Sequence, residues 1–385
     1  MHTQASVEDG LKANLCYPTT PEPLVKRWFL LASAVTIAAC GPDTGKGSGD
    51  TAKQAGASVG NVADLTGAGA TFPYPLYVRW VSEFRAKTGA KVNYQNIGSG
   101  GGIKQLAEQT VDFGASDAPM TDVELASAKG GPIVHIPTVV GVVALAYNVP
   151  DVAQPLKLTG PIVADIFLGK ITKWNDTRIA ALNPGVKLPG SDILVVHRSE
   201  GSGTSYIFTD YLSSVSPAWK AGPGKGKEVQ WPVGLGARGN EGVAGQIKQT
   251  PGAFGYVEVA FARQNRLGIA ELQNKNGKFV APTSAAATAA AEAAVTQFSP
   301  ATDYRVSIVN TAGDATYPIA SFTWLLVYRN MPDAKKAKTL TEFIRFGLTE
   351  GQKAAAPLDY APLPSALATR LVARADSIAL ASTAK

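Results

Sequence analysis

An unbroken apolar segment rich in β-branched residues runs from Ile133 to Asn148. An average strand has about 5–6 residues, so this segment is too long for one. One explanation is that it leaves one domain and enters a second, and we place this crossover near residues 141–146. A chain built in this way has to return to its first domain, and we expect that return near residues 314–319.

Strand-like and helix-like segments alternate along the chain from Asp64 onward. Strands are predicted at residues 91–95, 193–196, 254–258 and 322–328, and helices at residues 103–110, 285–295 and 365–381. Near-continuous apolar strands between helices are typical of parallel sheets that are covered on both faces. The chain has 385 residues, 45% of them hydrophobic and 17% charged, which suits two domains of ordinary size. We therefore predict an α/β fold.

The N-terminal region has the pattern of an export signal. Lys26 and Arg27 precede an apolar run from Trp28 to Ala39, which is shorter than the ~20 residues that span a bilayer. Small residues before Cys40 resemble a bacterial lipoprotein cleavage box, although a chance cysteine after an ordinary signal peptide is the alternative. We predict a signal peptide at residues 1–39, with a start that is over-extended, and a protein outside the cytoplasm. Lipidated Cys40 would anchor it to the membrane, in the periplasm or at the cell surface.

Composition excludes several classes of protein. Residues 40–63 are rich in Gly, Ser, Ala and Lys and could build no core, so they are predicted to form a flexible tether. The net charge of +6 is compatible with an anionic ligand or membrane surface, but it is too mild to indicate nucleic-acid binding. Two cysteines exclude a disulfide framework. Because no metal-ligand spacing occurs, we expect no metal and no cofactor.

Three glycine-rich segments each precede a predicted helix. They are residues 66–73, in which Thr71 is a predicted N-cap, residues 98–102 before a helix from Ile103, and residues 198–205. A helix N-terminus exposes unpaired N–H groups and a partial positive charge, and glycine lets that backbone approach a ligand. A turn before a capped helix explains any one of these segments. Three of them in one chain favour a shared anion site that needs no metal.

Two charged residues refine this prediction. Arg198 directly follows an apolar strand, which is where ligands bind in open α/β sheets, and Glu200 is close enough to orient its guanidinium. Arg198 and Glu200 could instead form a simple surface pair. Asp117 precedes another predicted helix, and as a carboxylate it would repel an anion unless the ligand carried a proton. Protonated phosphate offers such a proton and sulfate at neutral pH offers none, so Asp117 would discriminate between them.

At these residues the chain closely resembles the phosphate-binding proteins of bacterial phosphate ABC transporters. The matching strings cover essentially the whole folded part, in family order, and are found at residues 65–73, 97–102, 112–119, 165–171, 173–176, 201–205, 239–242, 251–258 and 358–360. The resemblance implies a periplasmic-binding fold of type II, with two α/β lobes joined by two crossover strands and the ligand in the cleft between them. We assign residues 64–142 and 316–385 to lobe 1 and residues 143–315 to lobe 2.

The resemblance also implies a ligand set and partners. Dehydrated phosphate would be held by protein groups alone, from Thr71, Phe72, Ser99, Asp117, Arg198, Ser202, Gly203 and Thr204. Glu200 stands where some relatives have Asp as the partner of the arginine, which leaves the geometry of that pair open. The implied partners are a membrane permease pair with its ATPase, and the implied activity is binding and delivery of phosphate without catalysis. We expect a monomer.

Three other functions have weaker support. A formal G-x-G-x-x-G at residues 234–239 would suit an oxidoreductase, but Pro232 disfavours the central strand that this motif requires. A formal G-x-S-x-G at residues 56–60 lies in the tether, without the strand–turn–helix context of a hydrolase. His135 and His197 lie in apolar strand contexts typical of structural residues. A binding protein for another oxyanion, such as sulfate, molybdate or arsenate, is the third alternative.

Overall fold

The long apolar segment forms one strand, β4 (Ile133–Tyr147), and all 15 of its residues are buried. It is seen in the computed structural model, which describes residues 62–383. The predicted signal peptide, Cys40 and residues 40–61 of the predicted tether lie outside the described residues. A strand of this length can remain buried only if it has partners along its whole length, and β4 finds them in two sheets.

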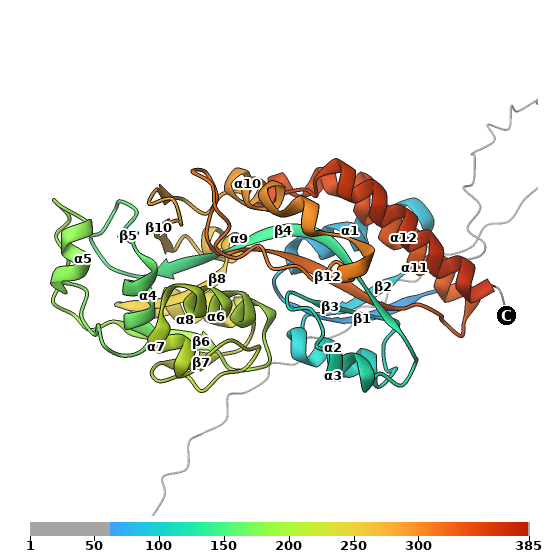
Figure 1. Cartoon of the computed structure of the whole chain (residues 1–385), viewed down its shortest axis with the longest axis horizontal. Helices are drawn as coiled ribbons and strands as arrows, with labels where there is room; N and C mark the ends of the chain where they lie inside the picture. The colour runs from blue at the N-terminus through green and yellow to red at the C-terminus, as the bar shows by residue number, and fades with distance from the viewer. Residues whose placement is uncertain (1–61, 384–385) are drawn as a thin grey trace, which may run out of the picture. The chain divides into compact units, whose positions relative to one another are not determined.

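The pairing of β4 changes partner in its middle. Residues from Ile133 to Val142 pair antiparallel with β12 (Ala320–Tyr328), and residues from Val143 to Tyr147 pair antiparallel with β8 (Ala253–Glu258). The change lies inside the interval expected for the crossover. Figure 1 shows β4 running through both halves of the folded part of the chain. The chain returns just before β12, where the Val143 N–H donates to the Ile319 carbonyl at 2.8 Å.

Both sheets are mixed. The first has the order β2-β1-β3-β12-β4, and the second continues from β4 as β8-β6-β7, with β9 also paired to β4. The outer strands of each sheet are parallel, as expected, but the prediction was wrong for β4 and β12, which run antiparallel to their neighbours. The remaining strands of these sheets are β1 (Leu65–Gly69), β2 (Val92–Gln95), β3 (Phe113–Ser116), β6 (Leu194–Arg198), β7 (Leu235–Ala237) and β9 (Gly268–Ile269). A small third sheet contains β5 (Lys157–Leu158), β10 (Glu271–Gln273) and β11 (Phe279–Val280).

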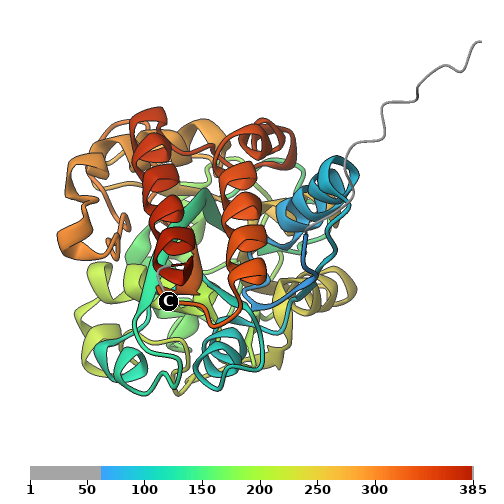
Figure 2. The same ribbon diagram turned by 90° about the vertical axis from the view of Figure 1, so that its right-hand side faces the viewer.

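Helices cover these sheets. Figure 2 shows α11 and α12, the last two helices, side by side at one end of the unit. The helices are α1 (Tyr74–Thr88), α2 (Ser99–Ala107), α3 (Asp122–Ala126), α4 (Gly160–Phe167), α5 (Thr177–Leu182), α6 (Gly203–Val215), α7 (Pro217–Ala221), α8 (Gly239–Gln249), α9 (Val259–Gln264), α10 (Ser284–Ala294), α11 (Ala334–Leu348) and α12 (Ser365–Thr383). Short 3₁₀ turns occur at Val295–Gln297, Pro300–Thr302, Glu350–Ala354 and Ala356–Leu358. Within residues 62–383, no helix is both long enough and apolar enough to cross a membrane.

The start of α2 differs from the prediction. The helix was expected from Ile103, but it begins at Ser99, so the glycine run forms its first turn. Glycine is a poor helix former, at about 1 kcal/mol below alanine, and it is selected here by close packing. A Cβ on Gly102 would lie 2.4 Å from the Gly69 Cα and 2.5 Å from the Ala68 carbonyl oxygen. The N-terminus of α2 can therefore press against the end of β1 only because these residues lack side chains.

The segment before β12 packs on the first sheet. The Phe298 ring lies 4.4 Å from the Phe322 ring, and the Trp324 indole N–H donates to the Tyr304 carbonyl at 3.0 Å. His135 is buried there, with its Nδ1 2.7 Å from an Asp303 carboxylate oxygen. The predicted lobe boundaries, 64–142 with 316–385 against 143–315, stay predictions.

Candidate functional site

Asp117 directly follows β3 and is almost completely buried, at 1% exposure. One carboxylate oxygen accepts a hydrogen bond of 2.7 Å from the Thr323 hydroxyl, and the Asp117 N–H donates to the Ser99 hydroxyl at 3.2 Å. Burial raises the pKa of Asp117 to about 7, against the opposing effects of the Thr323 hydrogen bond and the Arg198 charge. The carboxyl group therefore titrates near neutral pH. In its ionised form it can accept a hydrogen bond from a protonated ligand.

Arg198 ends β6 and is 3% exposed. Its Nε donates to a Glu200 carboxylate oxygen at 3.0 Å, its Nη2 donates to the same oxygen, and its Nη1 donates to the Thr204 hydroxyl at 3.2 Å. Burial alone would raise the pKa of Glu200, but the hydrogen bonds and charge of Arg198 outweigh it and hold that pKa low. The same Glu200 oxygen accepts the Gly239 N–H at 3.0 Å. The pair is therefore a built part of the interior, and a simple surface pair is excluded.

The third glycine-rich segment packs closely against Ser99 and Asp117. Ser202 caps α6 by accepting the Ser205 N–H at 3.0 Å, and Gly203 is the first residue of the helix. A Cβ on Gly203 would lie 2.5 Å from the Ser99 hydroxyl oxygen and 2.7 Å from the Asp117 nitrogen. The first N–H groups of a helix have no acceptor within it, so the N-terminus of α6 brings unpaired donors close to Asp117 and Ser99.

Thr71 does not cap α1, contrary to the prediction. The N-cap is Pro73, and no side chain caps the helix. The Thr71 hydroxyl oxygen instead accepts two hydrogen bonds from Asn240, at 2.8 Å from the side-chain amide and 3.2 Å from the backbone. Because both lone pairs of the Thr71 hydroxyl are occupied by Asn240, the hydroxyl cannot cap α1. Phe72 is fully buried, and its carbonyl accepts the Tyr360 hydroxyl at 2.7 Å.

The structure brings the predicted binding residues into one cluster. Gly203 meets Ser99 and Asp117, and Asn240 links Thr71 to Thr204, which contacts Arg198. The two sides also touch directly, because the Gly100 N–H donates to the Gly201 carbonyl at 2.8 Å. A cavity of about 530 Å³ opens beside this contact, lined by Gly100, Gly101, Lys104, Glu124, Gly201, Lys227 and Glu228. This cleft has α2 and α3 on one side and residues 201 and 227–228 on the other, and none of the eight predicted binding residues lines it.

The cluster contains one guanidinium, several hydroxyl and backbone donors, and Asp117 as an acceptor. Such a set can hold a small tetrahedral oxyanion that carries one proton. Within residues 62–383, no group of three His, Cys, Asp or Glu side chains could hold a metal ion. The two histidines within this range are engaged elsewhere, His135 with Asp303 and His197 stacked on Trp231 at 4.8 Å between ring centres.

Sequence comparisons agree with this geometry. A sequence model described as a PBP superfamily domain matches residues 44–350. The phosphate-binding protein PstS of Xylella fastidiosa (strain 9a5c) is 42% identical over 350 residues, which are 89% of this chain and 95% of the relative. The phosphate-binding protein PstS of Pasteurella multocida (strain Pm70) is 45% identical over 311 residues, 80% of this chain and 89% of the relative. This chain belongs to the PstS family of phosphate-binding proteins.

Solved structures share the fold of this PstS family member. A high-affinity periplasmic phosphate-binding protein, PfluDING, solved with phosphate, has a TM-score of 0.64 at 24% identity, covering 80% of this chain and 93% of that one. A phosphate-binding protein from Stenotrophomonas maltophilia has a TM-score of 0.62 at 24% identity, covering 81% and 93%. At these identities the likeness concerns the fold, and it confirms the predicted two-lobe α/β periplasmic-binding class.

Two residues of the cluster in this PstS family member escaped the sequence prediction. Asn240 and Thr323 contact predicted binding residues directly, yet they lie 169 and 206 positions away in the sequence from Thr71 and Asp117. Asn240 falls inside the family string at residues 239–242, which was the available signal, but no property of the string assigns it a role. Thr323 lies in an apolar strand and gives no signal at all.

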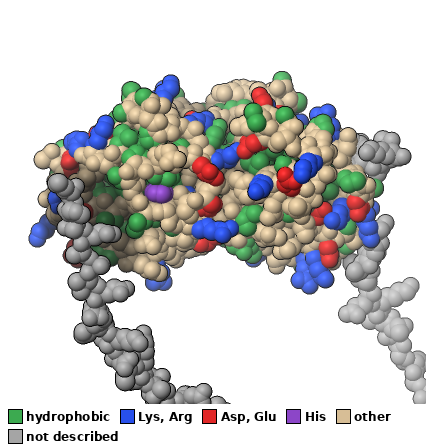
Figure 3. All heavy atoms as spheres, turned by 90° about the horizontal axis from the view of Figure 1, so that it is seen from below, with side chains coloured by type: hydrophobic (Ala, Val, Ile, Leu, Met, Phe, Trp, Pro, Cys, Tyr) green, Lys and Arg blue, Asp and Glu red, His purple; other side chains and the backbone are tan. Residues whose placement is uncertain are grey.

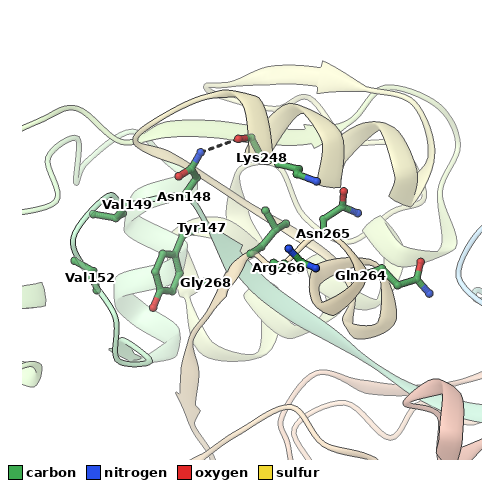
Figure 4. A pocket seen from close by; sticks show the side chains of 10 residues that line it. Tyr147, Asn148, Val149, Val152, Lys248, Gln264, Asn265, Arg266 and Gly268 are labelled. Atoms are coloured by element: carbon green, nitrogen blue, oxygen red, sulfur yellow. Dashed lines mark hydrogen bonds between the residues drawn. The ribbon is translucent and has the colours of Figure 1, made fainter.

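A second pocket lies at the far end of β4 (Figure 4) and is separate from the cluster. It is lined by Tyr147, Asn148, Val149, Val152, Lys248, Gln264, Asn265, Arg266, Leu267 and Gly268. The Asn148 side-chain amide donates to the carbonyls of Ile247 and Lys248, at 3.1 and 3.0 Å, and so closes the end of α8. None of the predicted binding residues lines this pocket.

Proposed function

We propose that this protein binds inorganic phosphate with high affinity outside the cytoplasmic membrane and delivers it to an ABC-type import permease. Membership of the PstS family supports the phosphate ligand, since its relatives at 42–45% identity carry the name phosphate-binding protein. The eight predicted residues, Thr71, Phe72, Ser99, Asp117, Arg198, Ser202, Gly203 and Thr204, are proposed to hold the anion.

The observation that carries this proposal is the buried carboxyl group of Asp117 in a cluster of donors. An acceptor beside an anion is favourable only if the ligand supplies a proton, which HPO₄²⁻ and H₂PO₄⁻ do and sulfate does not. A charge-assisted hydrogen bond contributes about 1.5–3 kcal/mol, and each tenfold of affinity corresponds to about 1.4 kcal/mol. Loss of that bond together with charge repulsion would separate phosphate from sulfate by several decades.

Calorimetric titration of the purified chain tests this function. We expect phosphate to bind tightly and a large excess of sulfate to compete poorly. In Asp117→Asn the preference for phosphate over sulfate should shrink by at least about tenfold. Asp192→Asn, which alters an exposed carboxylate paired with Lys173, is the matched control and should leave the preference unchanged. Equal affinity of the unaltered chain for both anions would refute the proposal and favour a less selective oxyanion-binding protein.

The cell location and partners form the finer part of the proposal. We propose that residues 1–39 are removed, that Cys40 becomes lipidated, and that residues 40–63 tether the folded part to the membrane. The folded part would act as a monomer that meets the permease pair and its ATPase. Mass analysis of the mature N-terminus in a bacterial host tests the anchor, because a diacylglyceryl group adds a defined mass to Cys40. Cleavage at another residue would contradict it.

We further propose that binding proceeds without catalysis and through closure of two lobes, residues 64–142 with 316–385 against residues 143–315. The change of partner within β4 supports a joint at this place. Small-angle scattering with and without phosphate tests closure, and equal dimensions would oppose it. Recovery of the phosphate unchanged after binding tests the absence of turnover, and chelator-sensitive ester hydrolysis would oppose it.

A further inference from the structure

Asn240 lies at the centre of the cluster, at the second position of α8, and is fully buried. It makes hydrogen bonds in three directions. Its side-chain NH₂ donates to the Thr71 hydroxyl oxygen at 2.8 Å and to the Thr204 hydroxyl oxygen at 3.1 Å. Its carbonyl oxygen accepts the Glu258 N–H at 2.9 Å, and its own backbone N–H donates to Thr71 at 3.2 Å. Both ends of its side-chain amide and its backbone N–H are therefore engaged.

These contacts fix which way the amide faces. The Glu258 N–H is a donor, so only the Asn240 oxygen can lie against it. The NH₂ group then faces the two threonines and supplies one proton to each. A flipped amide would set its NH₂ group against the Glu258 N–H, donor against donor, and would turn the two threonine hydroxyls from acceptors into donors toward Asn240.

The number of lone pairs then decides whether each threonine hydroxyl donates or accepts its next hydrogen bond. A threonine hydroxyl has one proton to donate and two lone pairs to accept with. The Thr71 oxygen accepts from the Asn240 side chain and backbone. The Thr204 oxygen accepts from Asn240 and from the Arg198 Nη1 at 3.2 Å. With both lone pairs occupied, each hydroxyl can form a further hydrogen bond only by donating its proton.

We propose that Asn240 is a positioning residue that sets both threonine hydroxyls as donors toward the bound anion. This inference rests on the proposed phosphate-binding function. The Thr323 hydroxyl already donates to one oxygen of Asp117. With the threonine lone pairs occupied, the Asp117 carboxylate, which also contacts Ser99, would be the acceptor for the proton of the ligand. Asn240 thereby makes the site selective for a ligand that accepts hydrogen bonds at nearly every position and donates at one.

Asn240 also couples the two walls of the cleft. Thr71 precedes α1 beside the first sheet, whereas Thr204 lies in α6 beside the second. One amide group therefore bonds to both walls at once, with one proton for each. Opening of the cleft would break the bonds from Asn240 and free the lone pairs of Thr71. The Thr71 hydroxyl is therefore restricted to donating only in the closed form.

A thermodynamic cycle tests this role. Phosphate dissociation constants would be measured by calorimetry for Asn240→Ala, for the double variant Thr71→Val with Thr204→Val, and for the triple combination. If Asn240 acts through the hydroxyls, Asn240→Ala should weaken binding roughly tenfold to a hundredfold in the unaltered chain. In the valine background it should weaken binding less than about threefold. Equal losses in both backgrounds would overturn the inference.

The isosteric variant Asn240→Asp gives a readout that a purely structural role would not move. Its carboxylate keeps one oxygen for the Glu258 N–H, but the other would accept the threonine protons and turn their lone pairs toward phosphate. We expect at least a hundredfold weaker binding at about pH 8, with partial recovery relative to the unaltered chain as the pH falls to about 5 and the new carboxyl group is protonated. A loss that is the same at every pH would overturn the inference.

Controls separate this inference from folding and from the proposed function. Asn183→Ala removes another buried asparagine, one that bonds to Lys157 and Ile179, and should lower the melting temperature without changing phosphate affinity. If Asn240→Ala does not fold, Asn240→Ser replaces it in the cycle. Lack of phosphate binding by the unaltered chain would overturn the proposed function and this inference together. Normal binding by that chain with additive losses would overturn the inference alone.

Discussion

Substitution of Gly203 by alanine should block closure of the cleft while leaving the fold intact. Gly203 begins α6, and the added Cβ would lie 2.5 Å from the Ser99 hydroxyl oxygen, 2.6 Å from the Asp117 Cβ and 2.7 Å from the Asp117 nitrogen. Contacts under 3.0 Å are essentially never seen for a real Cβ. Two of these three atoms belong to the Asp117 backbone or its Cβ and cannot rotate away. The only relief is to move α6 away from the opposite wall.

The magnitude follows from this crowding. Insertion of one methyl group into a well-packed site costs about 1–3 kcal/mol, which corresponds to roughly a 5- to 150-fold weaker binding of phosphate. The unliganded protein can relieve the clash by opening, so its free energy of unfolding should hardly change. Alanine is also a better helix former than glycine by up to about 1 kcal/mol, which would offset part of any remaining strain.

The assay compares two glycine substitutions of the same kind. Gly245→Ala, at a half-buried position of α8, is the matched control, since a Cβ there meets no atom within 4 Å. Calorimetric titration should give a weakened phosphate affinity for Gly203→Ala alone, and thermal melting without phosphate should give similar midpoints for both variants. Wild-type affinity in Gly203→Ala would refute the closure of the cleft at this contact.

Three further outcomes are expected. Burial raises the pKa of Asp117 from 3.8 to about 7, so between these pH values the folded state holds a proton that the unfolded state has released. The stability contributed by this proton is fully present below about pH 4 and is lost as the pH rises through 7. Without phosphate, Asp117→Asn should therefore gain up to about 4 kcal/mol on the unaltered chain across this interval in urea unfolding, and a constant difference would contradict this. Tyr360→Phe removes the 2.7 Å bond to the Phe72 carbonyl and should weaken phosphate binding by about 0.5–1.5 kcal/mol in calorimetry; unchanged binding would show that Phe72 needs no such support. Lys227→Gln breaks the partly exposed ion pair with Glu124 across the cleft and should speed phosphate release in stopped-flow by about two- to fivefold, an effect that fades in high salt; a salt-independent change would argue against an ion-pair latch.

The parts of the fold that the sequence could predict are those with a local cause. The crossover was predicted from the length of the apolar run at residues 133–148, which is far longer than an average strand. Strand direction has no such local signature, and for this reason β4 and β12 were wrongly expected to be parallel. The N-cap role of Thr71 failed for the same reason. A local rule assigned its hydroxyl to α1, while a partner 169 residues away, Asn240, uses it instead.

The candidate site divides in a similar way. Asp117 and Arg198 could be singled out because a carboxylate and a guanidinium beside glycine-rich helix starts have distinctive chemistry. Asn240 and Thr323 could not, because a neutral amide and a hydroxyl acquire their roles only from what faces them. Figure 3 shows a related limit on the surface, where acidic and basic side chains are interspersed on the face in view and composition alone does not say which of them pair.

The shared strand β4 determines how this molecule can be taken apart. Residues 143–315 are contiguous and could be expressed as a separate fragment, but this fragment would begin in the middle of β4. Its sheet would keep the pairing of Val143–Tyr147 with β8 and would lose the continuous backbone that β12 stabilises on the other side. A one-residue insertion near Gly141 would have an equally long reach, because it would turn every following side chain of β4 to the opposite face. Circular permutation or biosensor insertion should therefore be directed to surface turns and away from residues 133–147, where a single cut disrupts two sheets.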